Sequence, residues 1–299
     1  MRRCALVTGV SVVALGFPAL AAAQAWLPAK GEGAVAMTLA DYAFRGHFDS
    51  TGASDPFGGT HARSIAVEAT YAITDRVAVT AGLPFIATRL SGSFPAGVAL
   101  GPLDDGRYHA DFQDGRVELR FMAVLLPVTI TPLVGASIPS HAYEVTGEAV
   151  PGKRTREAFL GANVGRALGA RAYIHCRYVF TRVEKVVPEV KTLDRSTVEA
   201  EAGAMATRRL GLRALAIRQI THGGLDLEDM RTNPNFFRTH DRAARTNYLN
   251  VGGGATFAAM PAVDIFAVFL RTVAGENAHR ARSFSVGASW QFGGGFGRN

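Results

Sequence analysis

The chain has 299 residues, of which 48% are hydrophobic and 19% are charged, and its formal net charge is +7. This composition excludes a disordered chain and an ordinary bundle of membrane-spanning helices. The positive charge suits attraction to anionic headgroups or solutes. The sequence lacks the Lys and Arg runs with interleaved aromatic residues that are typical of nucleic-acid-binding proteins, so no nucleic acid partner is expected.

Residues 1–25 have the pattern of an export signal. Arg2 and Arg3 form a charged start, an apolar stretch follows, and small-x-small sites allow cleavage after Ala23 or Ala25. The small residues and the polar, Pro- and Gly-bearing continuation favour a cleaved signal peptide over an N-terminal membrane helix. Cleavage would leave a net charge of +5 and Cys176 as the one cysteine, which excludes an intrachain disulfide. We expect residues 26–299 to form a single domain.

Apolar and polar residues alternate over much of the remaining chain. In the clearest stretch, Ile174 and Tyr178 belong to one face of a strand, and His175 and Arg177 belong to the other. A period of two over roughly ten residues predicts β-strands. With weaker segments placed by their spacing, we expect twelve strands, at about 33–44, 62–73, 76–86, 115–124, 129–138, 156–167, 171–181, 195–206, 210–219, 245–257, 263–273 and 283–292.

The stretch 121–139 is long and apolar enough to resemble a membrane helix. Pro127, Pro132 and Pro139 would each interrupt a helix, and the Thr and Val content favours strands. We therefore predict two strands joined at Leu126-Pro127.

The connections between the predicted strands alternate in length. Those after even-numbered strands are short, whereas most of those after odd-numbered strands are long and polar, at 45–61, 87–114, 139–155, 182–194 and 220–244, with a modest one at 274–282. This pattern predicts an all-β fold, a closed antiparallel transmembrane β-barrel of the Gram-negative outer membrane, with short periplasmic turns and long extracellular loops. Lipid-exposed backbone must pair within the protein, so the sheet has to close. A soluble β-sandwich is the alternative, but it does not explain why the long loops keep to one side.

Aromatic residues near the strand ends should form two belts at the membrane boundaries. We expect Trp290 and Phe292 in the periplasmic belt. The other belt should contain Phe44, Phe85, Phe180 and Phe284.

Several short stretches of the chain resemble known outer-membrane proteins. Tyr71-Ala72-Ile73-Thr74-Asp75-Arg76 and Gly82-Leu83-Pro84-Phe85 resemble the strand-turn-strand of the phenol meta-pathway proteins, and Trp26-Leu27-Pro28 with Lys30-Gly31-Glu32-Gly33 is similar to their start. Ser289-Trp290-Gln291-Phe292 resembles the assembly signal that the barrel-assembly machinery recognises. The resemblance implies a barrel and a transporter of small compounds, aromatic ones among them, and it carries over no functional residues. This chain continues past the usual terminal aromatic, so its last strand ends at Phe292 or at Phe296.

Alternation directs a set of polar side chains toward the lumen. The predicted lumen-lining residues are Glu68, Arg116, Glu118, Arg120, Arg171, Tyr173, His175, Arg177, Glu199, Glu201 and Asp264. Arg177 should lie near Glu199 and Glu201, because their strands are neighbours. The set is either a web of ion pairs that plugs the barrel or a charge-lined path that selects polar or anionic solutes. The apparent surplus of positive groups on these strands favours the path.

Other candidate chemistry is weaker. Outer-membrane phospholipases carry a His-x-Ser-Asn-Gly run that is absent here, so no catalytic residue and no enzyme is predicted. The predicted outer loops contain many histidines and acidic residues, which could hold a metal or bridge lipopolysaccharide, but they show no fixed ligand spacing. We expect a solvated loop surface, without metal or cofactor. The residues are His47, His61, His109, His141, His222, His240 and His279, with Asp226, Glu228, Asp229 and Asp241.

The sequence thus predicts an outer-membrane channel or transporter for the passive or facilitated passage of small molecules, of aromatic or anionic character. Its expected partners are outer-membrane lipids, lipopolysaccharide, the barrel-assembly machinery and a small-molecule solute. The alternative is a plugged barrel with a structural or surface-interaction role, which would use loops 87–114 and 220–244 as its contact surface. The fold alone does not decide between them.

Overall fold

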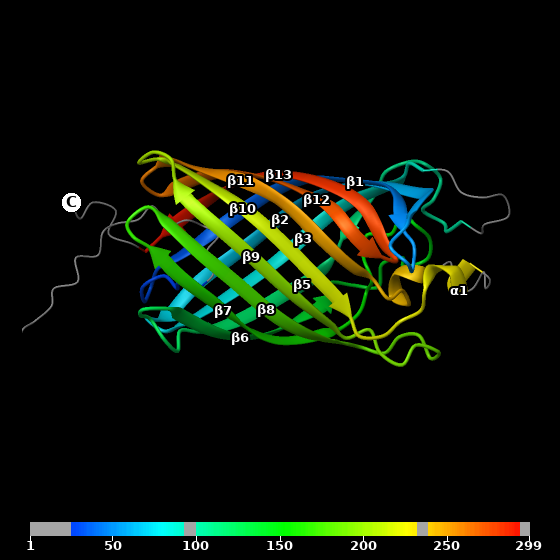
Figure 1. Ribbon diagram of the computed structural model, residues 1–299, viewed down its shortest axis with the longest axis horizontal. Coiled ribbons are helices and arrows are strands. Elements are labelled where there is room, and N and C mark those ends of the chain that lie inside the picture. The colour runs from blue at the N-terminus through cyan, green and yellow to red at the C-terminus, as the bar shows by residue number, and fades with distance from the viewer. Residues whose placement is uncertain (1–24, 93–99, 232–238, 294–299) are drawn as a thin grey trace, which may run out of the picture.

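The structure, a computed structural model, describes residues 25–92, 100–231 and 239–293, which form a single barrel (Figure 1). The predicted cleavage at Ala23 and the alternative strand end at Phe296 lie outside these residues. The strands are β1 Gly33–Phe48, β2 Ser54–Thr74, β3 Val77–Leu90, β4 His109–Phe112, β5 Asp114–Phe121, β6 Thr129–Pro139, β7 Glu157–Leu168, β8 Ala172–Val183, β9 Arg195–Met205, β10 Leu210–Thr221, β11 Asn247–Met260, β12 Val263–Glu276 and β13 Ala278–Phe292.

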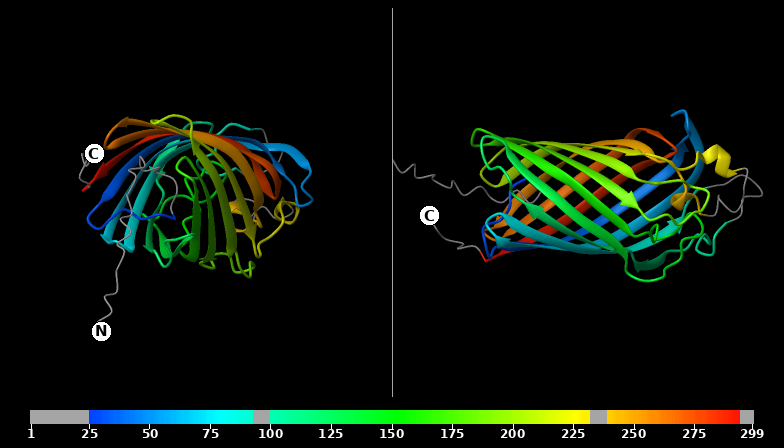
Figure 2. Two further views of the ribbon diagram at one scale, coloured as in Figure 1. Left: turned by 60° about the vertical axis from the view of Figure 1, so that its left-hand side comes forward. Right: turned by 90° about the horizontal axis from the view of Figure 1, so that it is seen from below.

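The sheet closes because the first strand pairs with the last. β1 is antiparallel to β13 from Gly33↔Phe292 to Phe48↔Ala278, and its other edge pairs with β2. Every further neighbour is antiparallel, and β4 is a short addition that pairs with β3 ahead of β5. The predicted closed antiparallel barrel is therefore confirmed, with twelve strands in the ring and β4 beside them (Figure 2).

The two ends of the barrel differ as predicted. One end has short connections, such as the two-residue turn Asp75–Arg76, and the other has the loops 91–108, 140–156, 184–194 and 222–246 (Figure 1). Following the rule for outer-membrane barrels, we call the first end periplasmic and the second extracellular. The two helices found within the described residues lie in the last of these loops, α1 at Leu227–Arg231 and the 3-10 turn η1 at His240–Arg242. Within the described residues, no helix is long and apolar enough to cross a membrane.

Two of the predicted extracellular connections, the long one at 45–61 and the modest one at 274–282, are mostly strand. β1 and β2 continue to a five-residue connection at 49–53, and β12 and β13 meet at Asn277 alone. Asn277 has a positive φ of 49°, a conformation that Asn adopts more readily than most residues, and this allows the tight turn. These four strands therefore extend past the 9–11 residues that lipid requires.

The aromatic belts are only partly as expected. Phe85, Phe284 and Trp290 are exposed on the outer face, and Phe292 stacks on Tyr71 with ring centroids 6.4 Å apart. The prediction for Phe44 is wrong. Phe44 follows the regular alternation of β1, in which Met37 and Leu39 face outward, so its side chain is buried on the inner face and its ring stacks on that of His279. The register shift between Phe44 and His47 then turns His47 to the same face.

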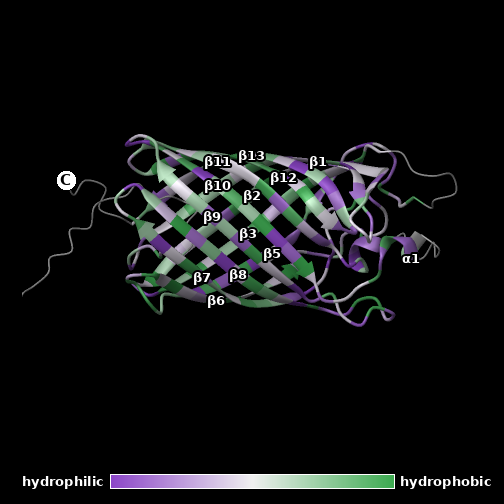
Figure 3. Ribbon diagram, viewed as in Figure 1, coloured by the Kyte–Doolittle hydropathy of each residue, from purple (hydrophilic) through white to green (hydrophobic). Residues whose placement is uncertain are grey.

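The outer face of the barrel is apolar. Hydrophobic and hydrophilic residues alternate along the strands in Figure 3, and the large hydrophobic side chains with high exposure include Val67, Ile174, Ile265 and Phe269. A continuous apolar surface of this kind is unfavourable in water and is typical of a lipid-facing barrel wall.

The extracellular loops fold back into the mouth of the barrel. The Thr60 hydroxyl on β2 donates to the Glu148 carbonyl, and Thr88 on β3 donates to the Ala149 carbonyl, so the loop 140–156 lies against the inner wall. Tyr143 in the same loop donates to Asp114, and burial together with this carboxylate raises the tyrosine pKa. The loops 184–194 and 222–246 pack on each other through a small apolar cluster. Its buried members are Val187, Val190, Leu227, Met230, Ala243 and Ala244.

The assignment of inner and outer faces can be tested with two adjacent residues at one depth. Val67→Arg places a charge in lipid and should destabilise the barrel by about 2–4 kcal/mol. Ala66→Arg points into the lumen beside Glu68 and should cost far less. Urea unfolding of both variants in vesicles would measure the difference, and equal costs would show that the assignment of faces is wrong.

Candidate functional site

A group of three arginines around one carboxylate lies on the inner wall of the barrel. Glu118 on β5 accepts hydrogen bonds from Arg116 at 2.9 Å and from Arg177 on β8 at 2.6 Å, and the Arg120 Nε atom lies 3.8 Å away. Glu118, Arg120 and Arg177 are buried, whereas 48% of the Arg116 side chain is exposed to the lumen. We call these four residues the Glu118 cluster.

The long reach of Arg177 joins strands that are not neighbours, since β6 and β7 lie between β8 and β5. Asn163, the partner of Arg177 in register, is fully buried and accepts from it at 3.3 Å. Glycine occurs at position 135, the β6 partner of Glu118, where a Cβ would collide with the Phe159 ring. The Arg116 guanidinium covers that ring at 4.2 Å from its centroid, so charge and aromatic surface are stacked.

A second polar group lies closer to the periplasmic end. Tyr173 on β8 donates to Glu201 on β9, and the Arg213 guanidinium on β10 lies 3.4 Å from the same carboxylate. The tyrosine ring lies flat over Gly203, where any Cβ would collide with it. His175 is buried beside them and is the register partner of Glu201.

The remaining predicted lumen residues are placed as follows. The register sets Glu199 opposite Arg177, but Arg177 bonds to Glu118 instead. Within the described part of the chain, neither Glu199 nor Glu68 forms an ion pair shorter than 4.0 Å, and they flank the Glu118 cluster on β9 and β2. Asp264 is buried near the periplasmic end and accepts from Gln291 at 2.9 Å.

Two predictions about the charged wall need correction. Arg171 lies in the exposed turn between β7 and β8, so it does not belong to the inner row. Arg213 was missed, because apolar residues occupy both faces of β10 and hide its alternation. Among the described residues, the inward arginines of the predicted set, with Arg213 added, are then Arg116, Arg120, Arg177 and Arg213, and the inward carboxylates are Glu68, Glu118, Glu199, Glu201 and Asp264, so the predicted surplus of positive charge is absent.

Several aliphatic side chains lie on the inner face of β10 to β12. The register pairs Leu215 with Glu201 and Ile217 with Glu199, which places both aliphatic side chains on the inner face of β10. Around the ring, Gly252 pairs with Leu215, and Leu270 pairs with Gly252. The lumen is thus two-sided at the level of Glu199 and Glu201, with charged groups on β5, β8 and β9 and the aliphatic residues Leu215, Ile217 and Leu270 on β10 and β12. Arg213 and Asp264 also lie on the inner face of β10 and β12, closer to the periplasmic end.

The start of the described chain crosses the periplasmic mouth. Ala25 is fully buried, and its carbonyl accepts a 2.6 Å hydrogen bond from the Thr131 hydroxyl on the inner face of β6. The Trp26 ring meets the Tyr173 ring edge-on at 6.2 Å. From there the chain runs to the far side, where Gly31 donates to the Ala72 carbonyl of β2. This position could not be predicted from the sequence, because no alternation or spacing relates residues 25–32 to β6 and β8.

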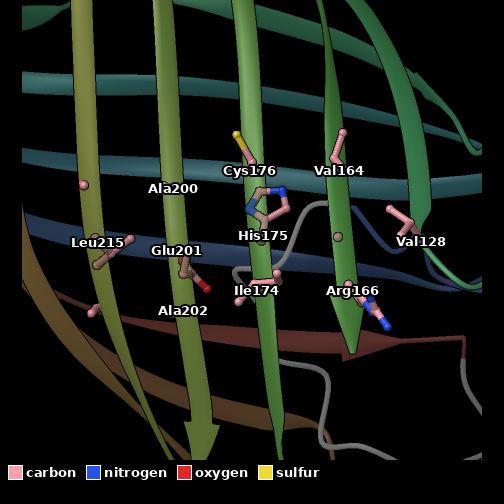
Figure 4. Close-up of a pocket in the computed structure, with 13 residues that line it drawn as sticks. Val128, Val164, Arg166, Ile174, His175, Cys176, Ala200, Glu201, Ala202 and Leu215 are labelled. Carbon is pink, nitrogen blue, oxygen red and sulfur yellow. The ribbon is translucent and has the colours of Figure 1, made fainter. Parts of the chain in front are cut away.

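A hollow of about 680 Å³ follows β7 to β10 (Figure 4). Its outward side chains include Ile174, Cys176 and alanines, while His175, Glu201 and Leu215 belong to the inner face. The alanines are Ala200, Ala202, Ala214 and Ala216. Short side chains on the outer face thin the wall here, and no set of polar groups converges on it.

Comparisons with known proteins support the fold. No family model matches the chain, and no curated protein matches its sequence. An outer membrane channel from Pseudomonas putida F1 is similar in structure, with a TM-score of 0.68 at 12% identity over 89% of this chain and 97% of that chain. The NanC porin gives 0.49 at 8% identity, over 85% and 98% of the two chains, and the KdgM porin in complex with disordered oligogalacturonate gives 0.45 at 6%, over 86% and 99%.

At these identities the first similarity shows an outer-membrane barrel fold, and the two porins add no argument. The more specific resemblance to the phenol meta-pathway proteins stays a prediction, as do the division at residue 25 and the cleavage of the signal peptide.

The Glu118 cluster should contribute to stability. Glu118→Gln leaves buried arginines without their shared carboxylate, and we expect a loss of about 3–5 kcal/mol in the free energy of unfolding. The double variant Glu118→Gln with Arg177→Met should recover part of that loss, because one unpaired cation is then absent. Urea unfolding in detergent measures both. A cost below about 1 kcal/mol for the single variant would indicate that water solvates the cluster.

Proposed function

We propose that the protein is an outer-membrane channel for small amphipathic solutes that carry one anionic group, aromatic carboxylates among them. The two-sided lumen is the observation that carries this proposal. A solute with a charged group and an apolar body can place each part against the wall that matches it.

Arg116 is the residue that we propose as the contact for the anionic group. It is half-exposed to the lumen, and a guanidinium has donors beyond the one that Arg116 gives to Glu118. Guanidinium groups bind carboxylates in two-bond geometry, which favours Arg over a diffuse positive field. Glu68 and Glu199 flank the cluster and limit the attraction, so single negative charges fit better than multiple ones.

The lumen is also narrowed at both ends by segments outside the strands. Residues 25–32 cross the periplasmic mouth, and loop 140–156 lies against the inner wall at the extracellular end. These features equally favour the alternative, a plugged barrel with a structural role. Conductance therefore separates the two functions better than any binding measurement.

Two partner surfaces belong to the same proposal. Arg271 and Arg282 are register partners, both exposed on the outer face above the apolar band, and they suit the phosphate groups of lipopolysaccharide. Trp290 and Phe292 lie at the periplasmic end of β13, with ring centroids 5.5 Å apart, as the assembly signal for the barrel-assembly machinery would require.

Selectivity tests the role of Arg116. In planar bilayers with a salt gradient, Arg116→Glu should shift the reversal potential toward cation preference, because charges that line a lumen set selectivity. It should also slow the uptake of benzenesulfonate into liposomes. Arg282→Glu, on the outer face, is the matched control and should change neither measurement. Unchanged selectivity in the folded Arg116→Glu protein would rule out Arg116 as the contact.

Conductance tests the periplasmic segment. In a protein cleaved after Ala23, Thr131→Val together with Trp26→Ala removes the anchors of residues 25–26, so the open fraction or the conductance should rise relative to wild type. Val179→Ala, which shortens an inner-wall side chain of β8 without touching the segment, serves as the control. If neither the wild type nor the double variant conducts, the structural role is supported and the channel is rejected.

A further inference from the structure

Three histidines from distant parts of the chain meet inside the extracellular mouth. His47 lies near the end of β1, His279 near the start of β13, and His240 at the start of η1. The His47 and His279 ring centroids are 4.9 Å apart, and the His240 Nε2 atom lies 3.4 Å from the Asp241 carboxylate. We call His240, Asp241 and His279, whose ligand atoms all lie within 4.8 Å of one another, the mouth cluster.

The barrel wall supplies one half of this arrangement. The register shift in β1 turns His47 inward, and pairing with β13 then places His47 opposite His279. Phe44 stacks on the His279 ring at 3.8 Å between centroids and holds it in place.

Four of the seven histidines expected in loops are in fact on strands, namely His47, His61, His109 and His279.

The loop 222–246 supplies the other half. Leu227 donates to the Asn277 side chain at the β12–β13 turn, and Asn277 donates in turn to Asp226. Leu225 and Ala243 are joined by a backbone hydrogen bond of 2.8 Å. These contacts bring η1 back to the wall, so His240 and Asp241 arrive beside His279.

The chemistry of the mouth cluster suits a divalent transition metal. Imidazole nitrogen and carboxylate oxygen are ordinary zinc ligands, and zinc–nitrogen bonds of about 2.0–2.1 Å place tetrahedral ligand atoms about 3.3 Å apart. The 3.4 Å separation of His240 and Asp241 has this value, and small side-chain rotations would close the widest separation of 4.8 Å. His240 is buried, while Asp241 and His279 are partly exposed, which leaves a path for an ion.

The surroundings of the mouth cluster also resemble those of a metal site. The Tyr42 hydroxyl lies 3.3 Å from His279 Nδ1, so with a metal on Nε2 the Nδ1–H would donate to the tyrosine. The Glu148 carboxylate lies 3.7 Å from His240 Nε2 and is positioned as an outer partner or a further ligand. Lys153 interacts electrostatically with Asp241 and would compete with a metal for that carboxylate.

We propose that His240, Asp241 and His279 bind Zn²⁺ or a similar first-row divalent ion, with His47 or Glu148 completing the coordination. The ion would link the end of loop 222–246 to β13 and so hold η1 against the barrel wall. This proposal is independent of transport, because a barrel with a structural role could bind the ion equally well.

The test uses the full-length folded protein, freed of metal with a chelator and titrated with Zn²⁺ by calorimetry. One equivalent should bind, and Co²⁺ should give the visible absorption of a four-coordinate site. Even the outer partners of ligands contribute about 10- to 100-fold in metal affinity, so His240→Ala should weaken binding by at least that factor. His141→Ala removes an exposed histidine paired with Asp111 at the same end and should leave the affinity unchanged.

Two further variants test the site from different sides. Lys153→Met removes the competing ammonium group and should tighten Zn²⁺ binding, whereas His279→Ala should weaken it as His240→Ala does. A shift in gel mobility on boiling would confirm that each variant is folded. The proposal is overturned if wild type binds no equivalent of Zn²⁺, if Co²⁺ gives a six-coordinate spectrum, or if folded His240→Ala binds as tightly as wild type.

Discussion

The pairing of β1 with β13 is the constraint on which the rest of the structure depends. In lipid, an unpaired strand edge would leave a row of backbone donors and acceptors without partners, at several kcal/mol for each group. The pairing from Gly33↔Phe292 to Phe48↔Ala278, interrupted only by the register shift between Phe44 and His47, removes both edges at once. Closure then fixes which side chains face lipid and which face the lumen, because successive residues point to opposite sides.

Closure also determines how charge is arranged inside. A lumen enclosed by twelve strands is too narrow for many solvated ions, so its charged groups must largely satisfy one another. Glu118 does this by accepting from arginines on two strands, and small neighbours such as Gly135 leave room for the long side chains. Most of the charges therefore gather on β5, β8 and β9, while β10 and β12 contribute aliphatic residues beside Arg213 and Asp264. This division gives the proposed channel its preference for amphipathic solutes.

Both mouths of the barrel are narrowed by segments outside the strands. At the periplasmic end the obstruction is a short chain segment held by Thr131 and Tyr173. At the extracellular end it is a set of loops with its own apolar cluster and hydrogen bonds to the inner wall. These segments are well packed, because several of the most buried apolar residues, such as Tyr143 and Met230, belong to the loops rather than to the strands.

The sequence by itself determined the number of strands, their approximate positions, the end that carries the loops and the inward face of residues such as Glu118 and Arg177. Period-two alternation reports a local property, the side of the sheet on which each residue lies. Contact with lipid favours apolar residues at the outward positions. Only the tertiary structure decided the partner of Arg177, the inward turn of His47, and the meeting of His240 with His279. Each of these depends on register, on an irregularity in one strand, or on contacts between segments far apart in the chain, and alternation contains no information about them.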